Sequence, residues 1–296
     1  MLPWLACGLV QVPPETLWTR ALERSRQAER AGVLVPLATE LLAGTPHPFV
    51  LRRLLNRTPK HLLAGGPKPN PFLPWEAGLE VERLGEGHIV LLNKYPVQCG
   101  HLLLITAGWK PQSGWLERAD WDAVMRVNAD TSGLWFFNSC PAAGASQPHR
   151  HLQLLPRRSD EPSCPMEALI DACLNQGNAV LDWTWAHALS PRQHSDDTDE
   201  LAAIVADHCR QLGLGCAATD PQPRAPYNLL FTDRWVLTVR RTREHWAGFS
   251  LNALGFAGYL LATERSDLAW LAEHGPWQLL AAVAEPGKPA APWDCG

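Results

Sequence analysis

Two imidazoles and a carboxamide alternate along one short stretch of this chain. His149, His151 and Gln153 are each separated by a single residue. Side chains on a β-strand point alternately to opposite faces, so these three share one face while Arg150 and Leu152 take the other. A neutral imidazole is available near pH 7, because its ordinary pKa is about 6.5. It can attack phosphorus and form a covalent intermediate.

Three interpretations of this polar face compete. It could be a strand with polar residues facing water. It could be half of a zinc site, but a structural zinc needs four ligands, a catalytic zinc usually takes three from the protein, and Gln is an unusual ligand. The eight cysteines include no Cys-x-x-Cys pair. The third interpretation is nucleophilic catalysis beside the small-residue loop 144–147, whose backbone can approach a phosphate closely. The residues alone leave the first and third interpretations open.

The wider sequence resembles a known family. Residues 149–153 resemble the His-x-His-x-Gln signature of the transferase branch of the histidine-triad superfamily. The longer run 144–153 is similar to one group of that branch, the ATP adenylyltransferases, also called diadenosine tetraphosphate phosphorylases. The resemblance continues in four further runs and covers most of the chain, from about residue 49 to about residue 261. These runs are 68–74, 88–97, 227–230 and 250–258.

This resemblance implies an enzyme that converts diadenosine tetraphosphate and phosphate reversibly to ADP and ATP. AMP would be transferred through a covalent adenylyl intermediate on His151, while Gln153 hydrogen-bonds phosphate oxygens and His149 orients its neighbours. No protein metal site is expected, because a divalent cation such as Mg²⁺ would be bound through the substrate phosphates. Two alternatives remain: a nucleotidyltransferase acting on sugar phosphates, and a nucleotide-binding regulator without catalysis.

The resemblance also implies a set of substrate-binding residues from both halves of the chain. They are Lys60, Asn93, Lys94, Asn138, Gly144, Ala145, Ser146, Gln147, Gln153, Asn252 and Leu254.

The elements that must position these residues follow from hydrophobic periodicity. Helices are expected at 15–32, 121–130, 166–177 and 199–213, with further helical structure between about 252 and 284. Asp120 and Asp199 are expected as N-caps. Strands are expected at 79–84, 88–94, 101–106 and 134–137, followed by a hairpin at 228–241 that turns at Asp233. Continuous apolar runs in these segments indicate central strands covered on both faces.

The predicted fold class is therefore α+β. The resemblance implies histidine-triad-like antiparallel sheets with packed helices, in two related halves that resemble a histidine-triad dimer. We expect residues 1–160 to form the catalytic half, with the His-x-His-x-Gln motif, and residues 161–296 to complete the nucleotide pocket.

Composition disfavours several classes of protein. Hydrophobic residues at 46% and charged residues at 19% are typical of a soluble globular protein, and a net charge of -4 argues against a nucleic-acid partner. The sequence contains no run of about 18 apolar residues, so no membrane span is predicted. The apolar start lacks a basic leading segment, so we expect a cytoplasmic protein with reduced cysteines. P-loop and Rossmann phosphate-binding patterns are absent from the sequence.

Overall fold

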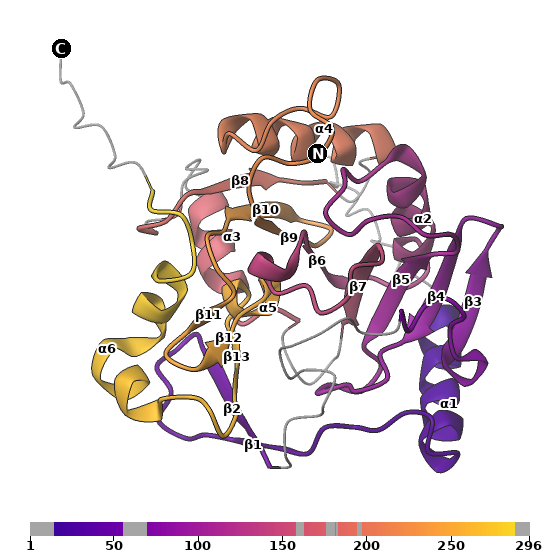
Figure 1. The fold of residues 1–296 in the computed structure, drawn as a ribbon, viewed down its shortest axis with the longest axis horizontal. Helices are drawn as coiled ribbons and strands as arrows, with labels where there is room; N and C mark the ends of the chain where they lie inside the picture. Colours follow the sequence, from indigo (N-terminus) through magenta and orange to yellow (C-terminus); the bar gives the residue numbers. More distant parts are fainter. Residues whose placement is uncertain are drawn as a thin grey trace, which may run out of the picture.

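A continuous antiparallel sheet forms the centre of the molecule (Figure 1). The computed structural model describes residues 15–55, 70–157, 163–175, 181, 183–193 and 197–287. Within these residues the main sheet has eight strands. In order across the sheet they are β3 (Glu80–Leu84), β4 (His88–Leu92), β5 (Leu102–Thr106), β7 (His151–Pro156), β6 (Gly133–Asn138), β9 (Tyr227–Phe231), β10 (Trp235–Arg240) and β8 (His187–Pro191).

The two halves of the chain meet inside this sheet. Strand β6 pairs antiparallel with β9, and the register places Asn138 opposite Asn228. A second link is the parallel pairing of β2 with β13. The described strands outside the main sheet are β1 (Thr39–Leu41), β2 (Val50–Leu54) and β13 (Tyr259–Ala262) in one small sheet, and β11 (His245–Trp246) and β12 (Phe249–Ser250) in another.

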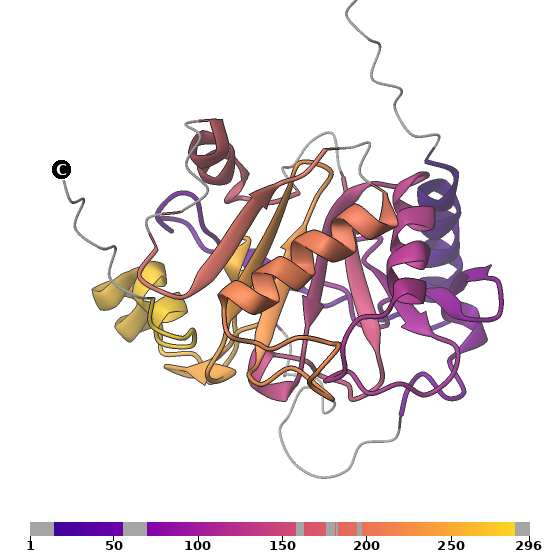
Figure 2. The same ribbon diagram turned by 90° about the horizontal axis from the view of Figure 1, so that it is seen from above.

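Three helices cover one face of the main sheet. They are α1 (Thr16–Arg30), α2 (Arg118–Asn128) and α4 (Thr198–Gln211). Helices α2 and α4 lie side by side, and α4 crosses β8 and β10 (Figure 2). The helices form because apolar residues recur at helical spacing: Leu17, Ala21 and Ala28 of α1 are all buried. They pack on the inward side chains of β7, including Leu152 and Leu154.

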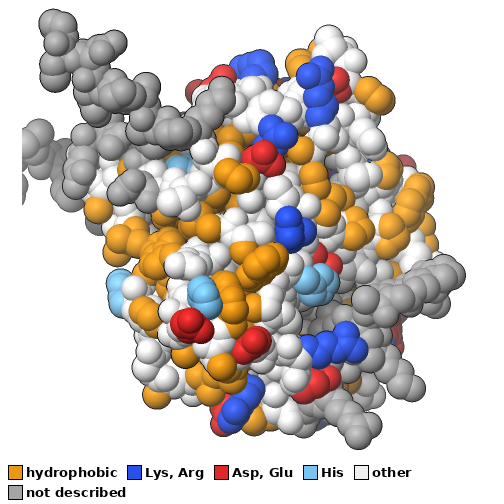
Figure 3. All heavy atoms as spheres, turned by 60° about the vertical axis from the view of Figure 1, so that its left-hand side comes forward, with side chains coloured by type: hydrophobic (Ala, Val, Ile, Leu, Met, Phe, Trp, Pro, Cys, Tyr) orange, Lys and Arg blue, Asp and Glu red, His pale blue; other side chains and the backbone are white. Residues whose placement is uncertain are grey.

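The remaining helices belong to the opposite side. They are α3 (Glu167–Asn175), α5 (Ala253–Phe256) and α6 (Leu268–Ala281), with the 3-10 helices η2 (Ala77–Leu79) and η3 (Pro141–Ala143) in loops. A second apolar cluster joins α3, α5 and α6 to Phe136, Leu230 and Trp235 of the sheet. Hydrophobic side chains also reach the surface on the side that carries α6 (Figure 3). Each face of the sheet therefore has its own core.

Most of the predicted elements are confirmed, with corrections at two helix starts and in the expected helical region 252–284, where strand β13 separates α5 from α6. The strands at 79–84, 88–94, 101–106 and 134–137 and the hairpin are present, and β4 and β5 are buried along their whole length. The expectation that Asp120 is an N-cap is wrong: Glu117 takes that position, and Asp120 completes a capping box with it from inside α2. Helix α4 is capped by Asp197 instead of Asp199, because the Asp197 carboxylate accepts the first free backbone N–H groups.

None of the helices in the described part of the chain is long and apolar enough to cross a membrane.

Candidate active site

The predicted alternation of polar and apolar residues before and along β7 is confirmed. Arg150 and Leu152 point to the helix-covered face, whereas His149 and His151 both contact the ring of Phe72, with ring centroids 5.5 Å apart in each case. His149 precedes the regular strand and forms an isolated bridge with Pro111. The polar face therefore lies opposite α1, α2 and α4, and its two histidines are buried, whereas Gln153 is half-buried.

His151 is held as a neutral imidazole with a defined tautomer. Only 3% of its surface is exposed. Its Nδ1 lies 2.8 Å from the carbonyl oxygen of His149, which can only accept, so Nδ1 carries the hydrogen and Nε2 keeps its lone pair. Within the described residues Nε2 has no hydrogen-bond partner. Burial lowers the pKa of His151 to about 4, so the ring is uncharged near pH 7 and Nε2 is available as a nucleophile.

His149 uses both ring nitrogens to support its neighbour. The Asn70 side-chain oxygen accepts the backbone N–H of Phe72, so the Asn70 amide nitrogen donates to Nδ1 of His149 over 3.0 Å. The other nitrogen, Nε2, then carries the hydrogen and donates to the carbonyl of Thr106 over 2.8 Å. A fully hydrogen-bonded imidazole cannot bind a metal without breaking these contacts. The arrangement fixes the His149 carbonyl that holds His151.

Gln153 has its amide orientation set by a chain of hydrogen bonds. The side-chain oxygen of Asn93 accepts the backbone N–H of Tyr95, so the Asn93 amide nitrogen donates to Nδ1 of His101. Nε2 of His101 then donates to Oε1 of Gln153 over 2.9 Å. Burial lowers the pKa of His101 to about 4, which keeps this imidazole neutral. Because Oε1 is occupied, Gln153 has its NH₂ group left as a donor for a ligand.

The small-residue loop packs against the second half of the chain. Gly144 has a φ of 86°, and a Cβ atom there would lie 2.6 Å from Cβ of Asn252, so only glycine fits. Asn138 ends β6, and its side-chain oxygen accepts from Asn228 over 2.8 Å and from the backbone N–H of Ala253 over 2.9 Å. Residues of both halves therefore shape the loop.

The other predicted binding residues differ in how far their side chains are exposed to solvent. Ala145 is buried, Ser146 is exposed, and Gln147 and Leu254 are half-buried. Asn252 caps α5 by accepting the backbone N–H of Leu254 over 2.9 Å.

Two predicted basic contacts have different outcomes. Lys94 forms a surface ion pair with Glu76 over 2.7 Å, and the hydrogen bond to Glu76 raises the Lys94 pKa. Lys60 lies outside the described residues.

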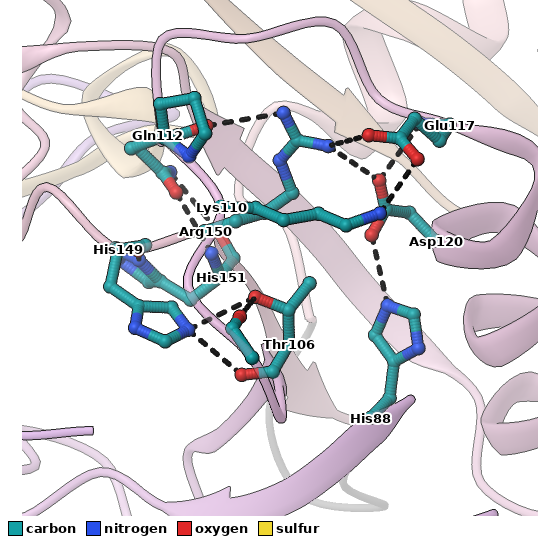
Figure 4. A network of polar contacts seen from close by, with 11 residues as sticks. His88, Thr106, Lys110, Gln112, Glu117, Asp120, His149, Arg150 and His151 are labelled. Carbon is teal, nitrogen blue, oxygen red and sulfur yellow. Dashed lines mark hydrogen bonds and ion pairs between the residues drawn. The ribbon is translucent and has the colours of Figure 1, made fainter. Parts of the chain in front are cut away.

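On the reverse face, Arg150 anchors the histidine segment to helix α2. Its side chain points away from His149 and His151 toward Glu117 and Asp120 (Figure 4). Nη1 of Arg150 lies 3.0 Å from the Asp120 carboxylate, which also accepts from Nε2 of His88 at 2.9 Å. Asp120 and Arg150 are both buried. Burial alone would raise the Asp120 pKa, but the hydrogen bond from His88, the Glu117 N–H and the Arg150 charge together lower it.

Asp120→Asn should lower the free energy of unfolding by about 3 kcal/mol at pH 7, because Arg150 then stays buried with only the exposed Glu117 carboxylate, 3.3 Å away, as countercharge. The folded-state pKa of Asp120 is depressed, so its carboxylate stabilises the fold above the ordinary value of 3.8. That stabilisation is lost as the pH falls below this value. The free energies of unfolding of wild type and variant, measured in urea, should therefore show a gap that narrows as the pH falls. The matched control is Asp122→Asn on the exposed side of α2, which should change little at any pH. A gap that is constant with pH would contradict this prediction.

Several site residues were not predicted from the sequence. Gln112 is buried, accepts the backbone N–H of His151 over 2.8 Å, and donates to the carbonyls of Asn138 and His151. It lies in an irregular loop with no periodic pattern to mark it. His101 had one signal, a polar ring directly before the largely apolar strand β5. Asn138 lies near His151, because Gln112 bridges the backbones of the two residues.

The site side chains described above that could coordinate a metal ion are imidazole and amide groups. Among the described residues no cluster of three or more His, Cys, Asp or Glu side chains could hold a metal ion.

Comparisons with known proteins agree over most of the chain. A sequence model described as the Ap4A phosphorylase N-terminal domain matches residues 9–172, and one described as the ATP adenylyltransferase C-terminal domain matches residues 181–286. Ap4A is diadenosine tetraphosphate. The Saccharomyces cerevisiae protein named diadenosine 5',5'''-P1,P4-tetraphosphate phosphorylase 2 is 28% identical over 218 residues, which is 64% of this chain and 66% of that protein. Protein APA1 of the same yeast is 27% identical over 195 residues, 58% of this chain and 60% of that protein.

Solved structures share the fold. The crystal structure of yeast Ap4A phosphorylase Apa2 has a TM-score of 0.74 and 23% identity, and the match covers 94% of this chain and 100% of that one. The complex of the same yeast protein with Ap4A has a TM-score of 0.73 and 22% identity, with the same coverage. The likeness supports a histidine-triad-like α+β fold for the sheet and helices described above.

Proposed function

Because this chain belongs to the Ap4A phosphorylase family, we propose that it catalyses the reversible phosphorolysis of Ap4A to ADP and ATP. The observation that carries the proposal is the tautomer of His151. Its Nδ1–H is held by the His149 carbonyl, and its buried, uncharged Nε2 faces away from that bond. A neutral imidazole with one free lone pair is the group that nucleophilic attack on phosphorus requires.

In the first step, Nε2 of His151 attacks one α-phosphorus of Ap4A. A P–N bond forms, the bond from that phosphorus to the bridging oxygen breaks, and ATP leaves. The positive charge that develops on the ring is stabilised at Nδ1 by the His149 carbonyl. The NH₂ group of Gln153 donates to an oxygen of the reacting phosphate or of the leaving group, which offsets its negative charge.

In the second step, an oxygen of inorganic phosphate attacks the adenylyl group on His151. The P–N bond breaks, Nε2 regains its lone pair, and ADP is released. Neither displacement needs a strong base, because phosphate is already an anion. Gln153 cannot take a proton from water, since an amide is not a base near neutral pH. The acceptor is therefore phosphate.

Magnesium fits this site only as a partner of the substrate. The nitrogen and amide groups described above are poor magnesium ligands, and His149 has both ring nitrogens occupied. We propose that Mg²⁺ is held by the polyphosphate and water, where it would neutralise phosphate charge. The residues of the chain then bind and orient the phosphates around it.

Product analysis tests the proposed function. Ap4A should persist in phosphate-free buffer and yield ADP and ATP when phosphate is added. Incubation with ADP labelled at the α-phosphate should transfer label to the wild-type chain by reversal of the second step, with release of phosphate, and not to His151→Ala. Release of AMP and ATP at a comparable rate without phosphate would mark the chain as a hydrolase, and unlabelled protein would remove the covalent intermediate.

His101→Phe should lower kcat about 10- to 100-fold, because Gln153 loses the donor that fixes its amide orientation. The phenyl ring keeps the packing on Phe136, where the ring centroids are 5.7 Å apart. It leaves the Asn93 amide and Oε1 of Gln153 unpaired, which costs about 1–3 kcal/mol of stability. Steady-state kinetics and thermal unfolding measure both effects. The control is His187→Phe, a histidine of the edge strand β8, which should retain kcat. An unchanged kcat in His101→Phe would contradict the role of the hydrogen-bond chain.

A further inference from the structure

Arg241 is a buried cation whose bonding partners are all uncharged. Only 1% of its surface is exposed. Its guanidinium donates to the carbonyls of Val283, Arg243 and Leu251 over 2.8–3.0 Å and to the side-chain oxygen of Asn228. Its charge also lies 5.1 Å from the ring centre of Phe256. A buried cation without an anionic partner is costly, so such an arrangement calls for a reason.

The countercharge of Arg241 is remote. Among the described residues no carboxylate is in ion-pair contact with it. Glu244 raises its pKa from a distance, but that carboxylate accepts from the hydroxyl of Ser250 at 2.5 Å. Burial lowers the pKa of Arg241 to about 10, which still leaves the guanidinium charged near pH 7. Arg241 therefore keeps a positive charge that no described carboxylate neutralises by direct contact.

Arg241 is also connected to the loop at Gly144 by two routes. The Leu251 carbonyl that it holds would lie 2.7 Å from a Cβ atom on Gly144, so this carbonyl packs directly on the loop. The second route passes through Asn228. A guanidinium can only donate hydrogen bonds, so the side-chain oxygen of Asn228 must be the atom that faces Arg241. The Asn228 amide nitrogen then donates to Asn138 and to the Ala143 carbonyl, over 2.8 Å each.

We propose that Arg241 is a positioning residue of the candidate active site, which orders the Gly144 loop and whose unpaired charge favours ligands with several phosphate groups. The proposal rests on the proposed function for the identity of the ligand. It explains why a buried arginine in the second half of the chain is supported by carbonyls alone. The polyphosphate supplies the negative charge that no described carboxylate places in contact with Arg241.

Arg192 provides a matched control. It is also buried, but it lies at the opposite end of the β9–β10 hairpin, donates to the Thr232 carbonyl over 2.9 Å, and is 4.0 Å from the Asp233 carboxylate. Arg241→Met and Arg192→Met should both lower thermal stability. Their effects on nucleotide binding should differ, because only Arg241 is connected to the loop.

The test is calorimetric binding of AMP, ADP and ATP at fixed ionic strength. Arg241→Met should weaken ATP binding by about ten-fold or more and AMP binding much less, because the lost Coulomb attraction grows with ligand charge. Arg192→Met should leave the three affinities in their wild-type ratio. An equal loss for all three nucleotides in Arg241→Met would mean a purely structural role and overturn the proposal.

A charge-retaining variant covers the case in which Arg241→Met does not fold. Arg241→Lys should keep ATP affinity near pH 7 and lose it on raising the pH to about 9, because a buried ammonium gives up its proton more readily than an exposed one. Wild type and Arg192→Lys should not show this loss, and a loss shared by all three would overturn the proposal. Wild type that binds ATP but forms no ADP from Ap4A would refute phosphorolysis while leaving the role of Arg241 in place.

Discussion

His151→Ala should reduce turnover of Ap4A by at least about 10⁴-fold, because the proposed nucleophile is lost and, among the described residues, the neighbouring imidazoles of His149 and His101 have both ring nitrogens occupied. The fold should persist. The imidazole makes one hydrogen bond, to the carbonyl of His149, while Gln112 holds the backbone of the residue independently of its side chain. Steady-state rates, circular dichroism and thermal unfolding measured on the same preparation check both parts.

The control for His151→Ala is another buried imidazole. His208 of α4 is fully buried and hydrogen-bonded to Ser190 and Thr238, over 2.9 and 3.0 Å. His208→Ala should lose stability and keep kcat. Near-normal turnover in folded His151→Ala would remove this residue as the nucleophile.

Gln153→His should raise the ratio of hydrolysis to phosphorolysis, even where total activity falls. The imidazole can accept the hydrogen from His101 on one nitrogen and present N–H on the other. In the other tautomer, which gives up the hydrogen bond from His101, the nitrogen that faces the substrate keeps its lone pair and can take a proton from water. General-base assistance is worth about two to four decades in rate, so even a poorly placed ring should shift the ratio measurably.

The ratio is read as AMP against ADP formed from Ap4A at fixed phosphate. Gln153→Asn is the matched control, because it keeps an amide but shortens it, and it should lose rate without gaining hydrolysis. An unchanged ratio in an active Gln153→His variant would mean that residue 153 does not exclude water. The choice of acceptor would then come from phosphate binding at the Gly144 loop.

The parts of the site that were predictable from the sequence are those with a local period. The alternation at residues 149–153 fixed which side chains share a face, and α1 and the β9–β10 hairpin were evident from spacing and turn residues. The short strands β1, β2, β8 and β13 were missed. Strands β2, β8 and β13 pair with distant segments, as β2 does with β13, and β1 has three residues that pair only with β2, so their own sequences carry little signal.

The supporting residues were missed for a related reason. Gln112 and His101 act through hydrogen bonds to residues far along the chain, and Arg241 through bonds to loop residues that have no regular spacing from it. The polarity of such bonds is decided by a partner that can only donate or only accept, for example the Arg241 guanidinium or the Tyr95 backbone N–H. No spacing rule contains that information. The helix starts at Glu117 and Asp197 show the same limit. In each case two acidic residues could cap the helix, and three-dimensional contacts decide which one does.

The pairing of β6 with β9 has a consequence for how the protein is made. Synthesis proceeds from the N-terminus, so His151 leaves the ribosome well before Asn228 and Ala253, which hold Asn138. A half-finished chain therefore carries the reactive histidine without the contacts that shape the loop at Gly144. Such sequence-distant contacts make folding slow, because the chain entropy is lost before the contacts form. We therefore expect the loop at Gly144 to take its final shape only after residues 228–253 have been translated.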